Sequence, residues 1–224
     1  MTVLSEGNNF RDIVRYEGDN AGRLSRIVVT VVSGLNLLMG TVLGMITKST
    51  PTTGTAAVGN TGGGTVGSVT AGAKAKIGEY QIKCVAYTAS PLAATFEVTD
   101  PDGVRLPDAS LAAYVSDAIN FDIADGSPDI AVGDIWTITI VKGSEQVKGI
   151  TPGAVDGTQD AYGILTADCD ATLAAKEAVA VYKDAVIIEA NLVWPVYSPA
   201  ITTPQKAVAV DQLKAKGIVA RLEA

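Results

Sequence analysis

Residues 27–47 read IVVTVVSGLNLLMGTVLGMIT, a stretch without a charged side chain. A stretch of this length is long enough to cross a bilayer as a helix, and it contains a G-x-x-x-G pair at Gly40 and Gly44. Its middle, SGLN at 33–36, is rich in turn-forming residues, and the run before it is β-branched. The pattern therefore predicts two short buried strands, over 27–32 and 41–46, joined by a turn, and no association with a membrane.

The composition of the whole chain favours a β protein with an aliphatic core. Of its 224 residues, 47% are hydrophobic but only 5% are aromatic, and 23 are glycine. Many Val, Thr and Gly residues are typical of short strands and tight turns. The net charge of −7 argues against binding to nucleic acid or to anionic lipid, because both attract basic surfaces.

The chain contains no histidine, which excludes Ser-His-Asp and Cys-His catalysis and His-ligated zinc. The two cysteines, Cys84 and Cys169, are too few for a disulfide framework, and we expect both to be buried free thiols. The N-terminal residues carry early charges and no apolar run, unlike a secretory signal. We therefore expect a protein that is made and used without export and that holds no metal or cofactor.

Two breaks in composition divide the chain. Residues 50–65 (TPTTGTAAVGNTGGGT) have almost no large side chains, and VKGSEQVKG begins at Val141. Between them, alternating apolar and polar residues in IGEYQIKCVAY and AINFDIADG predict strands, as do ATFEVTD and IWTITIV. We expect an immunoglobulin-like β-sandwich over 58–147, although the Cys…Trp…Cys spacing of a true immunoglobulin domain is missing.

The outer pieces, 1–57 and 148–224, are expected to form a second, discontinuous β domain. Near its end, Thr203 and Pro204 predict the start of one short helix, which Gly217 closes. The final apolar run, IVARL, predicts a last strand.

Four segments of the outer pieces occur in an order that is similar to one known family. They are 24–47, 155–172 (VDGTQDAYGILTADCDAT), 183–194 (KDAVIIEANLVW) and 210–222 (VDQLKAKGIVARL). Their combination resembles the head decoration proteins of tailed phages, typified by the phage lambda protein. The resemblance implies a small β-clip-like fold, interrupted here by the sandwich, and a trimer on the outer surface of the virion's expanded head that stabilises it against internal DNA pressure.

The resemblance also implies a partner, the major capsid protein, and an N-terminal capsid-binding arm over residues 1–16. This arm is polar and contains glycine, yet it carries apolar anchors that would let it add as a strand to a capsid-protein edge. The alternative is a frayed terminus without a partner. The anchors are Val3, Leu4, Phe10, Ile13, Val14 and Tyr16. Contacts between trimer subunits are expected near Trp194 and Pro195, with plain core packing of Trp194 as the alternative.

Two rival functions remain open. Asp100/Asp102, Asp122/Asp125 and Asp168/Asp170 are carboxylate pairs that an enzyme or a calcium site could use, but their turn-like context favours local backbone hydrogen bonds. The run GNTGGGT lacks the G-K-[ST] of a phosphate-binding loop. The stronger rival is an outward-displayed module that binds host-surface carbohydrate, with sugar rings stacked on Tyr87, Tyr114 or Trp136; core packing of each aromatic is the equal alternative.

Overall fold

The computed structural model describes residues 9–18, 24–196 and 200–221. The chain divides into two compact units, which we call unit 1 (residues 1–47 and 144–224) and unit 2 (Lys48–Gly143). These boundaries lie earlier than the expected 58 and 147. Strand pairing accounts for the difference, because β5 (Thr55–Ala56) pairs within unit 2 and β13 (Val147–Gly149) pairs within unit 1.

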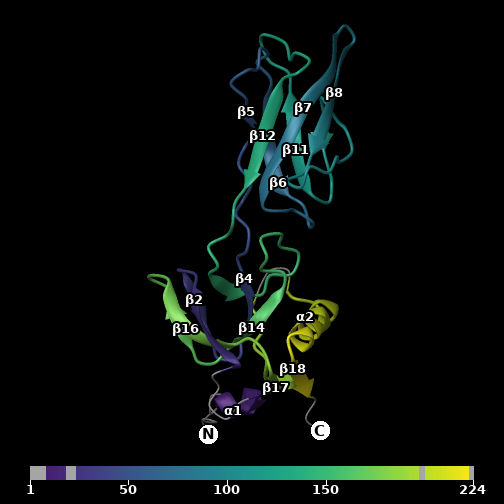
Figure 1. The fold of residues 1–224 in the computed structure, drawn as a ribbon. Coiled ribbons are helices and arrows are strands. Elements are labelled where there is room, and N and C mark those ends of the chain that lie inside the picture. The colour runs from purple at the N-terminus through teal and green to yellow at the C-terminus, as the bar shows by residue number, and fades with distance from the viewer. Residues whose placement is uncertain (1–8, 19–23, 197–199, 222–224) are drawn as a thin grey trace. The chain divides into compact units, whose positions relative to one another are not determined.

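The centre of unit 1 is a closed barrel of five strands in the order β13-β2-β16-β14-β4. Besides β13, its strands are β2 (Arg26–Val31), β4 (Val42–Met45), β14 (Ala161–Leu165) and β16 (Lys176–Val181). Figure 1 shows β2 and β16 side by side, and they pair antiparallel from Arg26↔Val181 to Val31↔Lys176. The predicted strands over 27–32 and 41–46 are confirmed, and they contribute Val29, Val31 and Leu43 to the barrel core.

The turn predicted in the middle of the uncharged stretch is only partly confirmed. Gly34 makes the turn with φ +87°, but Leu35 and Asn36 lie in a further strand, β3 (Leu35–Leu37). This strand pairs antiparallel with β15 (Cys169–Ala171). Within the ranges that the structure describes, no helix is both long enough and apolar enough to cross a membrane.

A second sheet of unit 1 brings the two ends of the chain together. Its order is β1 (Val14–Glu17), β17 (Ala185–Ile188), β18 (Ile218–Arg221), with β1 antiparallel and β18 parallel to β17. The short helix α1 (Phe10–Ile13) precedes β1, and the 3-10 turn η1 (Glu189–Asn191) follows β17.

The predicted C-terminal helix is α2 (Thr203–Ala215), and the predicted last strand is β18. The N-cap is Thr202, one residue earlier than expected, because the side chain of Gln205 accepts a hydrogen bond from the backbone N–H of Thr202 at 2.9 Å. Gly217, with φ +79°, ends the helix as predicted.

Unit 2 consists of two sheets. One has the order β10 (Ala113–Tyr114), β11 (Ile119–Ala124), β6 (Thr65–Ala71). The other has the order β5-β12-β7-β8-β9, formed with β12 (Ile135–Ile140), β7 (Gly78–Ala89), β8 (Leu92–Thr99) and β9 (Ala109–Ser110). The four strands predicted from alternation are β7, β8, β11 and β12, and both sheets turn their apolar faces into one core. The immunoglobulin-like assignment stays a prediction.

The two cysteines occupy different units. Cys84 lies in the core of unit 2 and Cys169 in the barrel core of unit 1, and both are free and buried. The prediction of two buried thiols is confirmed.

Candidate functional site

The N-terminal segment is part of the fold of unit 1 from Asn9 onward. Val3 and Leu4 lie outside the described residues. Ile13 and Val14 are buried, and Ile13 packs against Gly40, where its Cδ1 atom would lie 2.7 Å from an added Cβ. The predicted anchors Ile13 and Val14 therefore contact the core of their own chain and hold the segment in place.

The segment is fastened to the barrel by one arginine. The Arg26 guanidinium donates to both carboxylate oxygens of Glu17 and lies 4.8 Å from the centre of the Phe10 ring. These hydrogen bonds from Arg26 lower the pKa of Glu17, against an opposing effect of burial. Phe10 is half-buried beneath Arg26, and Tyr16 is 58% exposed.

Strand β1 lies at the edge of its sheet, where a polar hollow of about 280 Å³ is lined by the segment itself. The lining residues are Phe10, Arg11, Val14, Arg15, Tyr16, Glu17 and Arg26. β1 is thus an edge strand that carries an exposed tyrosine, Tyr16. Another extended chain can add to such a strand by main-chain hydrogen bonds.

A larger, mainly apolar groove of about 460 Å³ runs beside β3. Trp194 and Pro195 line it, together with β3, Thr41 and residues near Lys148. Trp194 is half-buried, packs against the core of the terminal sheet and lies 5.5 Å from the Lys206 ammonium. Leu38 and Val196, at the rim, are exposed, so this surface has apolar area that another polypeptide could cover.

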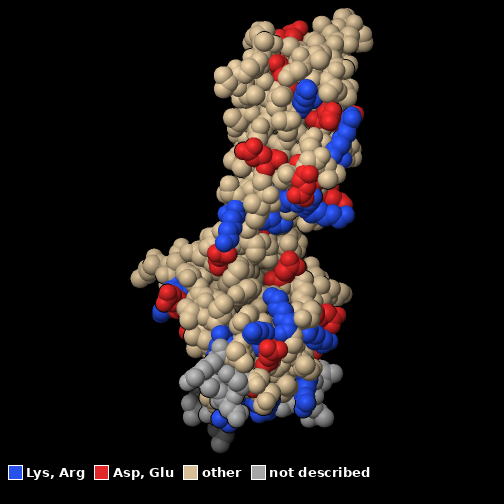
Figure 2. Space-filling model, viewed as in Figure 1, with Lys and Arg blue, Asp and Glu red and all other residues tan. Residues whose placement is uncertain are grey.

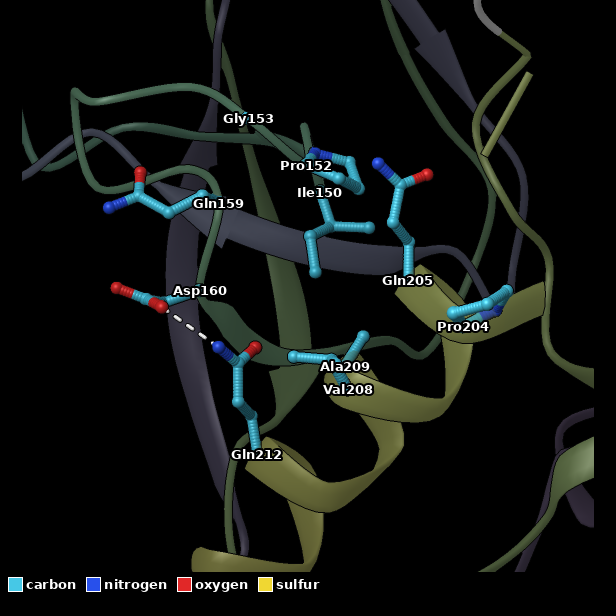
Figure 3. Close-up of a pocket in the computed structure, with 10 residues that line it drawn as sticks. All are labelled: Ile150, Pro152, Gly153, Gln159, Asp160, Pro204, Gln205, Val208, Ala209 and Gln212. Carbon is cyan, nitrogen blue, oxygen red and sulfur yellow. Dashed lines mark hydrogen bonds between the residues drawn. The ribbon is translucent and has the colours of Figure 1, made fainter. Parts of the chain in front are cut away.

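A third hollow of about 350 Å³ lies between α2 and the loop over 150–160 (Figure 3). Ile150 and Ala209 are buried at its floor, and the amides of three glutamines stand around it. The amide of Gln212 accepts from the backbone of Ala161 and donates to Asp160 at 2.8 Å, the bond that Figure 3 marks.

The DGTQ sequence at 156–159 builds this loop. The carboxylate of Asp156 accepts from the N–H and hydroxyl of Thr158, and the Gln159 side chain accepts from the N–H of Gly157. Gly157 has φ +104°, a conformation that glycine adopts readily. The motif is therefore a structural feature of unit 1.

The expected sugar-stacking aromatics of unit 2 are not all on its surface. Tyr114 and Trp136 are buried in the core, where Trp136 donates to the carbonyl of Gly64 at 3.1 Å. Tyr87 is half-buried, and its hydroxyl donates to Asp125 at 2.8 Å. Stacking of a sugar on Tyr114 or Trp136 is thus wrong for this fold.

The carboxylate pairs bind mostly their own backbone. Asp100 accepts from the N–H groups of Asp102 and Val104, and Lys76 bridges Asp100 and Asp102. Asp168 and Asp170 accept from the N–H groups of Met39 and Thr172, respectively. The prediction of a local backbone hydrogen bond is wrong for Asp122, which lies exposed in β11, and for Asp168, whose partner Met39 is 129 residues away along the chain. Among the residues described, no three Cys, Asp or Glu side chains are grouped so that they could hold a metal.

The backbone of the glycine-rich run binds a negatively charged group, which is the carboxylate of Asp134 in the same chain. The buried carboxylate of Asp134 accepts from the N–H groups of Thr61, Gly62 and Ala131. Burial opposes ionisation of Asp134, but these donors outweigh it and lower its pKa. No sequence pattern indicated that Asp134 is the partner of this run, because Asp134 lies more than seventy residues away along the chain.

Comparison with protein-family models matches residues 3–218 to the family described as "Bacteriophage lambda head decoration protein D". The chain belongs to this family. This family consists of structural phage head proteins, and membership in it indicates a place on the virion capsid.

Comparison with curated proteins gave no match. Among solved structures, two crystal forms of Xanthomonas campestris FlgL, in space groups H3 and C2, are similar to part of the head decoration chain. They are 17% and 18% identical, each with a TM-score of 0.31 over 50% of this chain. The chain spans about a third of the length of these structures (34% and 33%), and a likeness this weak carries no argument about fold or function.

Proposed function

We propose that unit 1 binds the outer surface of the expanded phage head as a homotrimer and stabilises the head against the pressure of packaged DNA. The observation that carries this proposal is the family match over residues 3–218. Such a protein acts through binding free energy alone. Since the contact is repeated at many sites, a modest affinity at each site stabilises the shell strongly.

The proposed capsid contact is the N-terminal arm, now narrowed to residues 2–8 with Val3 and Leu4, together with Tyr16 and the edge of β1. Support comes from the position of β1 at the edge of the terminal sheet and from the exposure of Tyr16. Ile13, Val14 and Phe10 anchor the arm to unit 1, because they pack against its core or beneath Arg26.

The proposed contact between trimer subunits is the groove lined by Trp194 and Pro195. Its support is the apolar rim formed by Leu38 and Val196, which would lose its exposure to water in an assembly. The major capsid protein of a tailed phage is the proposed partner, and unit 2 is proposed to be an immunoglobulin-type sandwich displayed outward.

The second candidate function is recognition of a host-surface carbohydrate by unit 2. The one observation in its favour is that unit 2 is a separate compact unit. Two of the three candidate aromatics of unit 2, Tyr114 and Trp136, are buried. A glycan array probed with the full chain tests it, and binding to a sugar family that Tyr87→Ala abolishes would support it.

The deciding experiment mixes the purified chain with undecorated, expanded heads and images them for density at three-fold positions. We expect decoration by the full chain and at least tenfold weaker binding by a chain that lacks residues 2–8. Tyr16→Ala should also weaken binding, whereas Leu173→Ala, on an exposed loop, should not. Bare heads after incubation with the folded full chain would overturn the proposed function, and full binding by the truncated chain would overturn the role of the arm.

A further inference from the structure

Three segments of unit 2 meet at one end of the unit: the loops over 57–64 and 125–134, and the end of the β7–β8 hairpin over 84–94. We call these three segments the distal loops. The pairing of Ala56 with Trp136 lies next to this end. The bridge between Lys48 and Lys142, where the chain enters and leaves unit 2, lies at the opposite end of the same ladder. The distal loops are therefore as far along the strands as possible from the connection to unit 1.

Direct hydrogen bonds hold the distal loops to one another. Gly133 donates to the carbonyl of Cys84 at 2.9 Å, and Gly63 donates to that of Pro128 at 2.7 Å. Asp134 accepts from the 57–64 loop, as described above, and Asp125 accepts from Tyr87. A surface that is already fixed in shape loses little conformational entropy when a partner binds.

The distal loops carry exposed aliphatic side chains. Each loop contributes at least one exposed aliphatic side chain, namely Val58, Val85, Leu92 and Val132. Val58 and Val132 are 107% and 64% exposed, so neither supports the core. Exposed aliphatic side chains on segments that are fixed in shape are available for contact with another macromolecule.

The charges of the distal loops have one sign. The three segments contain Asp125 and Asp129, the buried Asp134, and no Lys or Arg. The nearest base, Lys83, lies opposite Glu97 in the neighbouring strand. At the top of Figure 2 the surface is tan with red patches, and blue begins farther down.

The exposed side chains and charges of the distal loops favour one class of binding partner over the others. Nucleic acid and anionic lipid are repelled by an acidic surface. A sugar ring could not stack on Tyr114 or Trp136, because both side chains are buried. A polypeptide with both basic and apolar side chains complements the aliphatic surface and its carboxylates.

We propose that the distal loops form a docking surface for a cationic, apolar polypeptide segment. The valines would contact its apolar side chains, and Asp125 and Asp129 would face its Lys or Arg residues. This surface is separate from the head-binding surface proposed for unit 1.

The test measures fluorescence anisotropy of labelled peptides with the full chain at physiological salt. The probes are 12-residue peptides that alternate Leu with Lys, Ser with Lys and Leu with Glu. We expect the Leu/Lys peptide to bind at least tenfold more tightly than the other two. The double variant Val58→Ser with Val132→Ser should lower this affinity at least fivefold, and Asp129→Asn should lower it less.

Val115→Ser is the matched control, because Val115 is 79% exposed and follows β10 at the opposite end of unit 2. It should bind the Leu/Lys peptide as the unaltered chain does. Equal binding of the Leu/Lys and Ser/Lys peptides would overturn the proposal, as would equal loss in the control and the double variant. Binding to heads should be unchanged in all these variants, so failure here is distinguishable from failure of the proposed function.

Discussion

The Glu17 carboxylate receives two hydrogen bonds from the Arg26 guanidinium, at 2.8 Å from Nε and 2.6 Å from Nη2. This pair joins the N-terminal edge strand to the first barrel strand, and Phe10 lies against the same guanidinium. The pair thus connects the segment next to the proposed arm with the core of unit 1.

Glu17→Gln should destabilise unit 1 by about 1 kcal/mol at pH 7, as expected for a partly exposed pair. The pKa of Glu17 is lowered in the folded state, so its contribution is complete above the unfolded value of about 4.3 and is lost as the pH falls through the folded value. Thermal melts of the variant and the unaltered chain should therefore converge as the pH falls below the folded pKa of Glu17. The exposed Glu177→Gln is the control, and a constant difference from pH 7 to pH 3 would contradict the assignment.

Ile13→Ala should destabilise unit 1 by about 2–4 kcal/mol, because Ile13 is 1% exposed and its loss leaves a cavity next to Gly40. Tyr16→Ala, three residues later on an exposed position, should change stability by less than about 0.5 kcal/mol. Urea unfolding measures both. Equal effects of the two substitutions would mean that the segment is not packed as described.

Gly62→Ala should destabilise unit 2 by about 1–3 kcal/mol, since an added methyl group meets backbone that cannot move freely. The new Cβ would lie 2.6 Å from the carbonyl oxygen of Asp129 and from the Cα of Ile130. Gly59→Ala, in the same loop, meets nothing within 4 Å and should be neutral. Denaturant melts that showed the two variants equally stable would rule out the close packing of the glycine run.

Val196→Glu should shift the assembled protein toward monomer, because it places a charge at the apolar rim of the Trp194 groove. Val208→Glu, at an exposed position on α2, is the matched control. Sedimentation velocity at micromolar concentration measures the effect. A trimer in both variants would place the subunit contact elsewhere.

Removal of unit 2 should leave unit 1 folded. Ile46 donates to Gln146 at 2.9 Å and Glu145 donates to Ile46 at 3.0 Å, so the two ends of unit 1 already lie side by side. Joining Thr47 to Ser144 with Asn-Gly supplies a hairpin turn of a favoured type. Circular dichroism and head binding should both be retained. An aggregated product that still aggregates with a longer Gly/Ser connection would show that unit 1 depends on unit 2.

Strands with clear periodicity could be predicted from the sequence. Two examples are the alternation around Tyr80, Ile82 and Cys84 and the β-branched run at 27–32. Both patterns follow from the local geometry of a half-buried strand, so they can be seen in residues that are neighbours in the sequence. Leu35–Leu37 was missed as a strand because its pairing partner lies at 169–171, and nothing local distinguishes it from a turn.

The side-chain roles in the arm could not be predicted for a related reason. Phe10, Ile13, Val14 and Tyr16 are all apolar or aromatic, and only contacts with Gly40, Arg26 and β17 separate buried anchors from exposed ones. The binding of the Asp134 carboxylate by the glycine-rich run could likewise not be predicted, because only the tertiary fold brings Asp134 to this run.

Cys84 and Cys169 each lie in the interior of a different unit. Neither thiol can meet an oxidant or another thiol unless its own unit opens, and burial raises the pKa of Cys84 further from the reactive thiolate. Exposure of the virion to air should therefore leave both thiols of this chain reduced and free of disulfide cross-links.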